Sequence, residues 1–170
     1  EAGRGSVLGP MVIAGVIIPE KMNKVLERMG VKDSKRLTAN RRVILSRKLK
    51  KMFDYEIVVI SAREIDDMRA DGINLNDIEK NAMRDLIIRM NPEKAIVDAV
   101  DVKAERFQNN LCESTGIDVI AEHKADDKYI EVSAASIIAK AERDAQIAEI
   151  TKDYIKMGGI GSGYPSDPAT

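Results

Sequence analysis

The stretch Met11-Val12-Ile13-Ala14-Gly15-Val16-Ile17-Ile18 is apolar and rich in β-branched residues, and Pro19 ends it. Such a run predicts a buried strand. Outward from it, similar short runs predict strands at residues 55–60, 95–97 and 117–121. Helical spacing or capping residues predict helices at 20–29, 38–53, 76–90, 101–113 and 129–157, with one more beginning at 61. Strands that alternate with helices indicate an α/β layered domain.

Length and composition narrow the class of protein. The chain has 170 residues, 44% hydrophobic and 32% charged, so we expect residues 1–170 to form one folded domain. No apolar run reaches the roughly 18–20 residues of a membrane-spanning helix, so no membrane partner is expected. The single cysteine, Cys112, excludes a disulfide framework and favours a reducing, cytoplasmic location. The single His123 lies far from Cys112 in sequence, which argues against a zinc site.

The charge balance sets a condition on any nucleic-acid function. The formal net charge is −1, so attraction to phosphate has to come from local patches or bound metal ions. With no Trp, two Phe and four Tyr, a platform of several base-stacking aromatic residues is not expected.

Three carboxylates stand at boundaries between predicted elements. Asp98 directly follows an apolar strand, Asp126 lies in a polar loop after another strand, and Glu1 precedes a glycine-containing turn. If they converge at one sheet edge, their oxygens suit Mg²⁺ or Mn²⁺. Two such ions can activate water and stabilise the leaving oxygen in phosphodiester hydrolysis. From spacing alone, helix caps or surface charges are the commoner explanation.

Neighbouring acids compete for these roles. Asp101 competes with Asp98, but its position suits a helix N-cap, whereas Asp98 directly ends the apolar run. Asp127 adjoins Asp126, and physical reasoning alone does not separate the two.

Residues 3–5, Gly3-Arg4-Gly5, are here named the glycine turn; its backbone amides can approach a ligand closely. It is neither a P-loop nor a dinucleotide fingerprint, and a tight turn is the plain alternative. Lys35 belongs to a basic cluster before a capped helix. Lys140 and Arg143 are three residues apart and share a helix face. These three cations are either phosphate contacts or solvated charges.

Taken together, the segments resemble the type 2 ribonucleases H, ribonuclease HII, and look most like the archaeal branch. They occur in the family's order and span essentially the whole chain. The segments are Glu1-Ala2-Gly3-Arg4-Gly5 with Gly9-Pro10, Asp33-Ser34-Lys35, Leu75-Asn76, Val97-Asp98, Glu122-His123-Lys124-Ala125-Asp126, Ser133-Ala134-Ala135-Ser136-Ile137-Ile138-Ala139-Lys140 with Arg143-Asp144, and Gly161-Ser162-Gly163-Tyr164-Pro165-Ser166-Asp167-Pro168.

The resemblance implies a ribonuclease H-like mixed sheet flanked by helices and a monomeric endonuclease. The family cleaves the RNA strand of RNA–DNA hybrids and nicks DNA on the 5′ side of single embedded ribonucleotides, leaving 5′-phosphate and 3′-hydroxyl ends. Four acids in the order Asp-Glu-Asp-Asp hold two divalent ions, Mg²⁺ or Mn²⁺. By resemblance Glu1 is the glutamate, Asp98 the third acid and Asp126 the fourth.

The resemblance also assigns the substrate contacts. The glycine turn, Gly3, Arg4 and Gly5, grips the ribonucleotide and its 2′-hydroxyl, largely through backbone groups. Tyr164 senses the neighbouring deoxyribose. By the same resemblance, Lys35, Lys140 and Arg143 are phosphate contacts.

The sequence departs from the family at both ends. The family's first aspartate directly precedes the glutamate, on a strand that is central in the sheet, and this chain starts at Glu1. A helical extension expected after Pro168 is also absent. We therefore expect a longer natural chain. The missing aspartate leaves a non-catalytic module that binds hybrid duplexes as the rival hypothesis, and an α/β nucleotide-binding metabolic enzyme as a third.

Overall fold

The computed structural model describes the backbone of residues 1–170 and the side chains of residues 1–32, 36–156 and 158–170. Its strands are β1 (Met11–Val16), β2 (Tyr55–Ile60), β3 (Lys94–Asp98) and β4 (Asp118–Glu122). Its α-helices are α1 (Asn23–Met29), α2 (Ala39–Met52), α3 (Ala62–Ala70), α4 (Leu75–Met90), α5 (Ala104–Thr115), α6 (Ala125–Lys128) and α7 (Ile130–Tyr154). Three 3₁₀ turns are η1 (Glu20–Met22), η2 (Val31–Arg36) and η3 (Ile155–Met157). The α/β class predicted from the sequence is confirmed.

Local capping signals explain most helix boundaries. The Thr38 side chain accepts a hydrogen bond from the Arg41 backbone N–H and begins α2. Ser61 and Glu64 form the capping box that their spacing predicts, and α3 follows. One cap differs from the prediction: α5 begins at Ala104, so Asp101 lies too far upstream to cap it.

The strands form two separate pairs in place of one continuous mixed sheet. β1 and β2 are antiparallel, with Met11 opposite Ile60, and β3 and β4 are parallel, with Asp98 opposite Glu122. Ala2 makes an isolated bridge to Val12 through two backbone hydrogen bonds of 2.8 Å. Because β3 and β4 run the same way, the polar residues that end them lie together.

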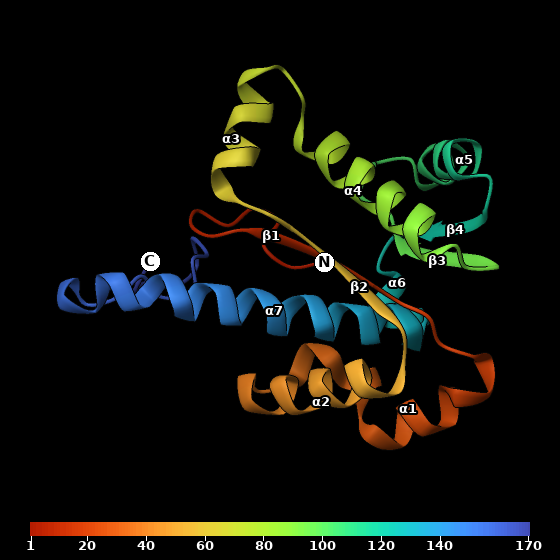
Figure 1. Cartoon of the computed structure of the whole chain (residues 1–170), viewed down its shortest axis with the longest axis horizontal. Coiled ribbons are helices and arrows are strands. Elements are labelled where there is room, and N and C mark those ends of the chain that lie inside the picture. Colours follow the sequence, from red (N-terminus) through yellow and green to blue (C-terminus); the bar gives the residue numbers. More distant parts are fainter.

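Helix α7 is the central support of the molecule. It lies between the β1–β2 pair and helices α1 and α2, while α4 and α5 lie with β3 and β4 on the other side of the strands (Figure 1). Two large apolar clusters fill these layers, beside a small one of Ala2, Val12 and Ala139. One joins α4 and α5 to the strands, and the other packs α7 on α1 and α2; their largest members are Met11, Ile13, Leu86, Phe107 and Leu111, and Leu26, Leu45, Leu49, Ile137 and Ile138. Among the described residues, no helix has both the length and the apolar character that crossing a bilayer requires.

Candidate active site

A pocket of about 340 Å³ gathers two of the three predicted acids, Glu1 and Asp98. Its wall is formed by the N-terminal segment, the end of β3, the loop to α5 and the turn after β4. The lining residues are Glu1, Arg4, Asp98, Ala99, Val100, Asp101, Val102 and His123. A larger, open hollow over α5, of about 630 Å³, is lined by none of the predicted site residues.

Asp98 occupies the carboxyl end of β3, as the apolar run before it predicts. Its Oδ1 accepts a hydrogen bond from the backbone N–H of Ala125, at 3.3 Å. Asp126 follows Ala125 in α6, and its carbonyl accepts a hydrogen bond from the Ser133 hydroxyl at 2.6 Å. Asp126 is therefore adjacent in sequence to Ala125, a direct partner of Asp98, although Asp126 is not part of the pocket wall.

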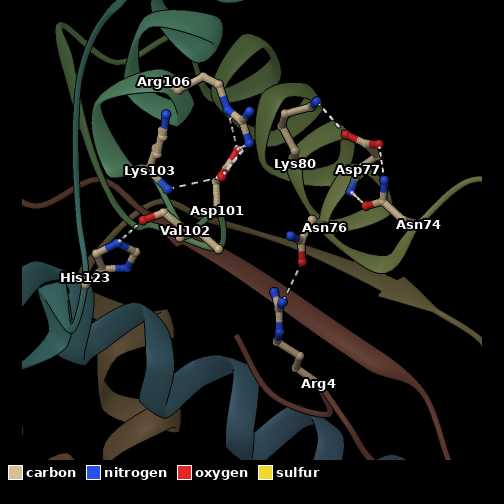
Figure 2. Close-up of polar contacts among 10 residues, drawn as sticks. All are labelled: Arg4, Asn74, Asn76, Asp77, Lys80, Asp101, Val102, Lys103, Arg106 and His123. Carbon is tan, nitrogen blue, oxygen red and sulfur yellow. Dashed lines mark hydrogen bonds and ion pairs between the residues drawn. The ribbon is translucent and has the colours of Figure 1, made fainter.

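Asp101 lines the same pocket, but its carboxylate is hydrogen-bonded to Lys103 and Arg106. Both of its oxygens accept hydrogen bonds from Arg106, the shortest at 2.6 Å, and Oδ1 also accepts from the Lys103 backbone N–H (Figure 2). These bonds, those to Arg106 first, hold the pKa of Asp101 below its usual value. A ring nitrogen of His123 bonds the Val102 carbonyl at 3.2 Å. The geometry therefore gives Asp101 and His123 the role of fixing the loop at the pocket rim.

Glu79 on α4 is a site residue that the sequence reasoning missed. Its side chain is fully buried, and its Oε2 accepts a hydrogen bond from Arg4 Nη1. The pKa of Glu79 is raised to about 9, mainly by burial and next by the adjoining Glu1 carboxyl. Arg4 has the opposite, lowering effect. The sequence does hold one signal that could have identified Glu79. It is a glutamate within a helical stripe that is otherwise apolar and includes Ile78 and Ala82.

The acidic group fits a cation. Glu1 Oε2 and Glu79 Oε1 are both buried and accept no hydrogen bond from the described part of the chain. Because its raised pKa keeps Glu79 protonated at neutral pH, the unpaired Glu1 oxygen is the one that a divalent cation would compensate. Within the described residues, no set of three Asp, Glu, His or Cys side chains is already close enough to hold a metal ion. The pocket therefore offers oxygen donors from Glu1 and Asp98.

The glycine turn requires glycine at its first position. Gly3 has a φ of +95°, and a Cβ there would lie 2.3 Å from the Pro10 carbonyl oxygen. Its N–H donates a hydrogen bond to the Tyr164 hydroxyl at 2.9 Å. Gly5 also has a positive φ, +71°, but open space around it. The structure thus brings the glycine turn, which the resemblance assigns to the ribonucleotide, into direct contact with Tyr164, which it assigns to the neighbouring deoxyribose.

Arg143 lies in a different environment from the solvated face that its spacing with Lys140 suggests. The side chain is 2% exposed, and its guanidinium lies 4.2 Å from the centre of the Tyr164 ring. Nε donates to the Pro10 carbonyl, Nη1 to that of Ser162 and Nη2 to that of Leu8, at 3.0–3.2 Å. The Arg143 donors bind backbone carbonyls of the loop at residues 8–10 and of the C-terminal loop at Ser162. We therefore assign Arg143 a positioning role in place of the predicted phosphate contact.

The structure says less about the other two predicted phosphate contacts, Lys140 and Lys35. Lys140 is half-buried on α7. The Lys35 side chain lies outside the residues that the structure describes.

The fold and the acidic pocket define a class, because ribonucleases H are among the solved structures that superpose on this chain. Ribonuclease HII of Archaeoglobus fulgidus, solved in complex with PCNA, gives a TM-score of 0.89 at 44% identity over 99% of this chain and 80% of that one. Ribonuclease H2 of Pyrococcus horikoshii gives 0.88 at 42% identity, with the same coverage. Bst-RNase HIII, solved with Mn²⁺, gives 0.77 at 21% identity, which concerns the fold alone.

The sequence comparisons specify the family. The family model described as Ribonuclease HII matches residues 1–170. Ribonuclease HII of Methanobrevibacter smithii is 79% identical over all of this chain and 82% of its own length, and that of Methanothermobacter thermautotrophicus is 53% identical. The chain belongs to the ribonuclease HII family, whose members are endonucleases that cleave the RNA of RNA–DNA hybrids.

Proposed function

We propose that this endonuclease, besides cutting RNA–DNA hybrids, nicks duplex DNA on the 5′ side of a single embedded ribonucleotide and leaves 5′-phosphate and 3′-hydroxyl ends. The observation that carries the proposal is the shared pocket, in which Glu1 and Asp98 face the same space as Arg4 of the glycine turn. Acids that can hold cations thus lie beside a turn that can read sugar chemistry.

Two divalent ions, Mg²⁺ or Mn²⁺, are the cofactors in this proposal. Glu1 and Asp98 would hold them, Asp126 would complete the second ion's shell, and the resemblance adds an aspartate ahead of Glu1. Support comes from the orphaned Glu1 oxygen and the hard oxygen donors. When bound, such ions supply an activated water and stabilise the leaving 3′ oxygen.

This chain's own groups recognise the ribonucleotide in the proposal. Backbone groups of Gly3, Arg4 and Gly5 bind around the 2′-hydroxyl, which is what separates RNA from DNA at one position. Tyr164 packs against the next deoxyribose, and its contact with the Gly3 N–H supports a joint action. Lys140 and Lys35 remain proposed phosphate contacts.

The remaining parts of the proposal concern the molecule as a whole. We assign residues 1–170 to one ribonuclease H-like domain that works as a monomer. The single cysteine, Cys112, supports a location in the reducing cytoplasm.

The decisive experiment compares Asp98→Asn with Asp101→Asn in the full chain. Both lose one carboxylate from the same pocket, but only Asp98 is proposed to bind metal. With Mg²⁺ or Mn²⁺ and a duplex carrying one ribonucleotide, we expect D98N to lose cleavage and D101N to retain it, and EDTA to stop the unchanged protein. Cleavage by D98N at the normal rate would refute the metal assignment. Salt-sensitive binding without product, in the unchanged protein, would favour the binding module.

A further inference from the structure

We propose that Glu79 and Asn76, in the first turns of α4, are positioning residues that hold the Arg4 side chain and thereby fix the glycine turn for reading the ribose. The inference rests on the proposed function, because that function assigns the turn to the ribonucleotide. Glu79 and Asn76 act through Arg4, so neither is a catalytic residue.

The two acceptors match the two ends of one guanidinium. Arg4 Nη1 donates to Glu79 Oε2, and Nη2 donates to Asn76 Oδ1 at 2.6 Å. Figure 2 shows Arg4 directed toward Asn76 on α4. Residues 76 and 79 are three apart and therefore share a helix face. A planar fork with several donors can bind both acceptors at once, whereas a lysine ammonium is a single point charge.

Stability alone does not account for a carboxyl at position 79. Its side chain is fully buried, while the Arg4 side chain is 34% exposed. The neighbouring buried positions of α4 are apolar, among them Ile78, Ala82 and Met83. An apolar side chain at 79 would join this core without the cost of desolvating a carboxyl. The contact with Arg4 is what the buried carboxyl provides.

The contacts of Glu79 and Asn76 with Arg4, here named the clamp, form one of two anchors of the glycine turn. At residue 3 the backbone N–H is bound to Tyr164, and at residue 4 the side chain is bound to α4. Because Arg4 also lines the pocket with Glu1 and Asp98, a shift of its side chain moves the turn relative to the acids. A small misplacement of this kind in an active site can lower the rate strongly.

The test measures kcat and KM on a duplex with one ribonucleotide, in the full chain, together with thermal unfolding. The variants are Arg4→Lys, Glu79→Ala, Glu79→Gln and the double variant R4K/E79A. Asp85→Ala is the matched control, because Asp85 is an exposed carboxylate on the same helix that pairs with Arg84. We expect E79A and R4K each to lower kcat about tenfold, the scale of one charge-assisted hydrogen bond. D85A should leave it unchanged.

Two readouts separate positioning from mere support of the fold. E79Q keeps an oxygen that accepts from Arg4, so it should restore kcat to within about threefold. The double variant should be no slower than R4K alone, because both changes break one contact. Additive losses, or a normal kcat in E79A, would overturn the inference.

A further variant covers the case in which E79A does not fold. Asn76 is only half-buried, so Asn76→Ala tests the same clamp, with Asn76→Asp restoring the acceptor. We expect N76A to lower kcat severalfold and N76D to restore it; an unchanged kcat in N76A would count against the clamp. If the unchanged protein does not nick this duplex, the proposed function itself fails, whereas nicking that is insensitive to Arg4 and Glu79 rejects only the clamp.

Discussion

The Tyr164 hydroxyl accepts a hydrogen bond from the Gly3 backbone N–H at 2.9 Å, across 161 positions of the chain. This contact ties the glycine turn to the C-terminal loop and places a phenol beside the groups proposed to bind the 2′-hydroxyl. Its ring lies against the Arg143 guanidinium, so the hydroxyl and the ring have separate partners.

Tyr164→Phe removes the hydroxyl and keeps the ring. We expect kcat/KM for a single embedded ribonucleotide to fall about tenfold, while the free energy of unfolding changes by about 1 kcal/mol or less. Steady-state nicking assays and urea unfolding measure the two quantities. The control is Tyr154→Phe, at an exposed position near the end of α7, which should change neither. Equal activity of Y164F and Y154F would contradict the proposed role of the hydroxyl.

Arg143→Ala removes the donor of three backbone carbonyls at once. The bond to the Pro10 carbonyl is buried, whereas those to Leu8 and Ser162 are partly buried. Because an orphaned buried acceptor costs about 1–3 kcal/mol, we expect R143A to lose about 2 kcal/mol or more of unfolding free energy. Arg63, whose side chain is 91% exposed, provides the control, and R63A should stay within about 0.5 kcal/mol of the unchanged protein. Chemical denaturation followed by circular dichroism distinguishes the two. A small effect of R143A would show that water replaces the guanidinium.

Gly3→Ala and Gly5→Ala separate backbone strain from steric overlap. Both glycines have positive φ, but a Cβ at Gly3 meets the Pro10 carbonyl oxygen while one at Gly5 meets nothing within 4 Å. We expect G5A to cost about 1 kcal/mol through its φ alone. G3A should cost more and also displace the turn, with loss of nicking. Thermal unfolding and nicking rates test both, and equal losses of stability in the two variants would be inconsistent with the overlap.

Glu79 makes stability depend on pH. Its pKa rises from the usual 4.5 to about 9, so between these values the folded chain holds a proton that the unfolded chain has lost. The stabilisation is complete below pH 4.5 and is lost as the pH rises toward 9, by at most about 1.4 kcal/mol per pH unit for one proton. Glu79→Gln should remove this slope. Urea unfolding of the metal-free protein across the range measures it, and identical slopes would disprove the assignment.

Much of the fold follows from local sequence. The run at Met11–Val16 is apolar and β-branched, and the Ser61–Glu64 spacing is a complete capping box, so both elements are predicted by neighbours in the chain. Asp98 was locatable for the same reason, since it directly ends an apolar strand. Asp101 was wrongly expected to cap α5, because an aspartate at this spacing also suits the loop contacts with Lys103 and Arg106 that it makes.

The parts that sequence reasoning missed depend on distant partners. Glu79 contacts Arg4 across 75 positions, and Arg143 binds Pro10 across 133. On a helix, a charged residue is normally a surface residue, and only the tertiary fold shows that these two are buried. The register of long-range contacts is not encoded in local spacing. For Arg143 the spacing left a phosphate contact and a solvated face open, and the resemblance alone implied the phosphate contact.

The bond between residues 3 and 164 has a consequence for biosynthesis. A ribosome releases the beginning of a protein long before its end, so the first residues wait while most of the chain is made. Until position 164 has emerged, the turn at residues 3–5 lacks its phenol partner, and the loops around Arg143 stay open. The contact between Gly3 and Tyr164 therefore forms only after most of the printed sequence has been synthesised, and a nascent fragment that ends before residue 164 would lack it.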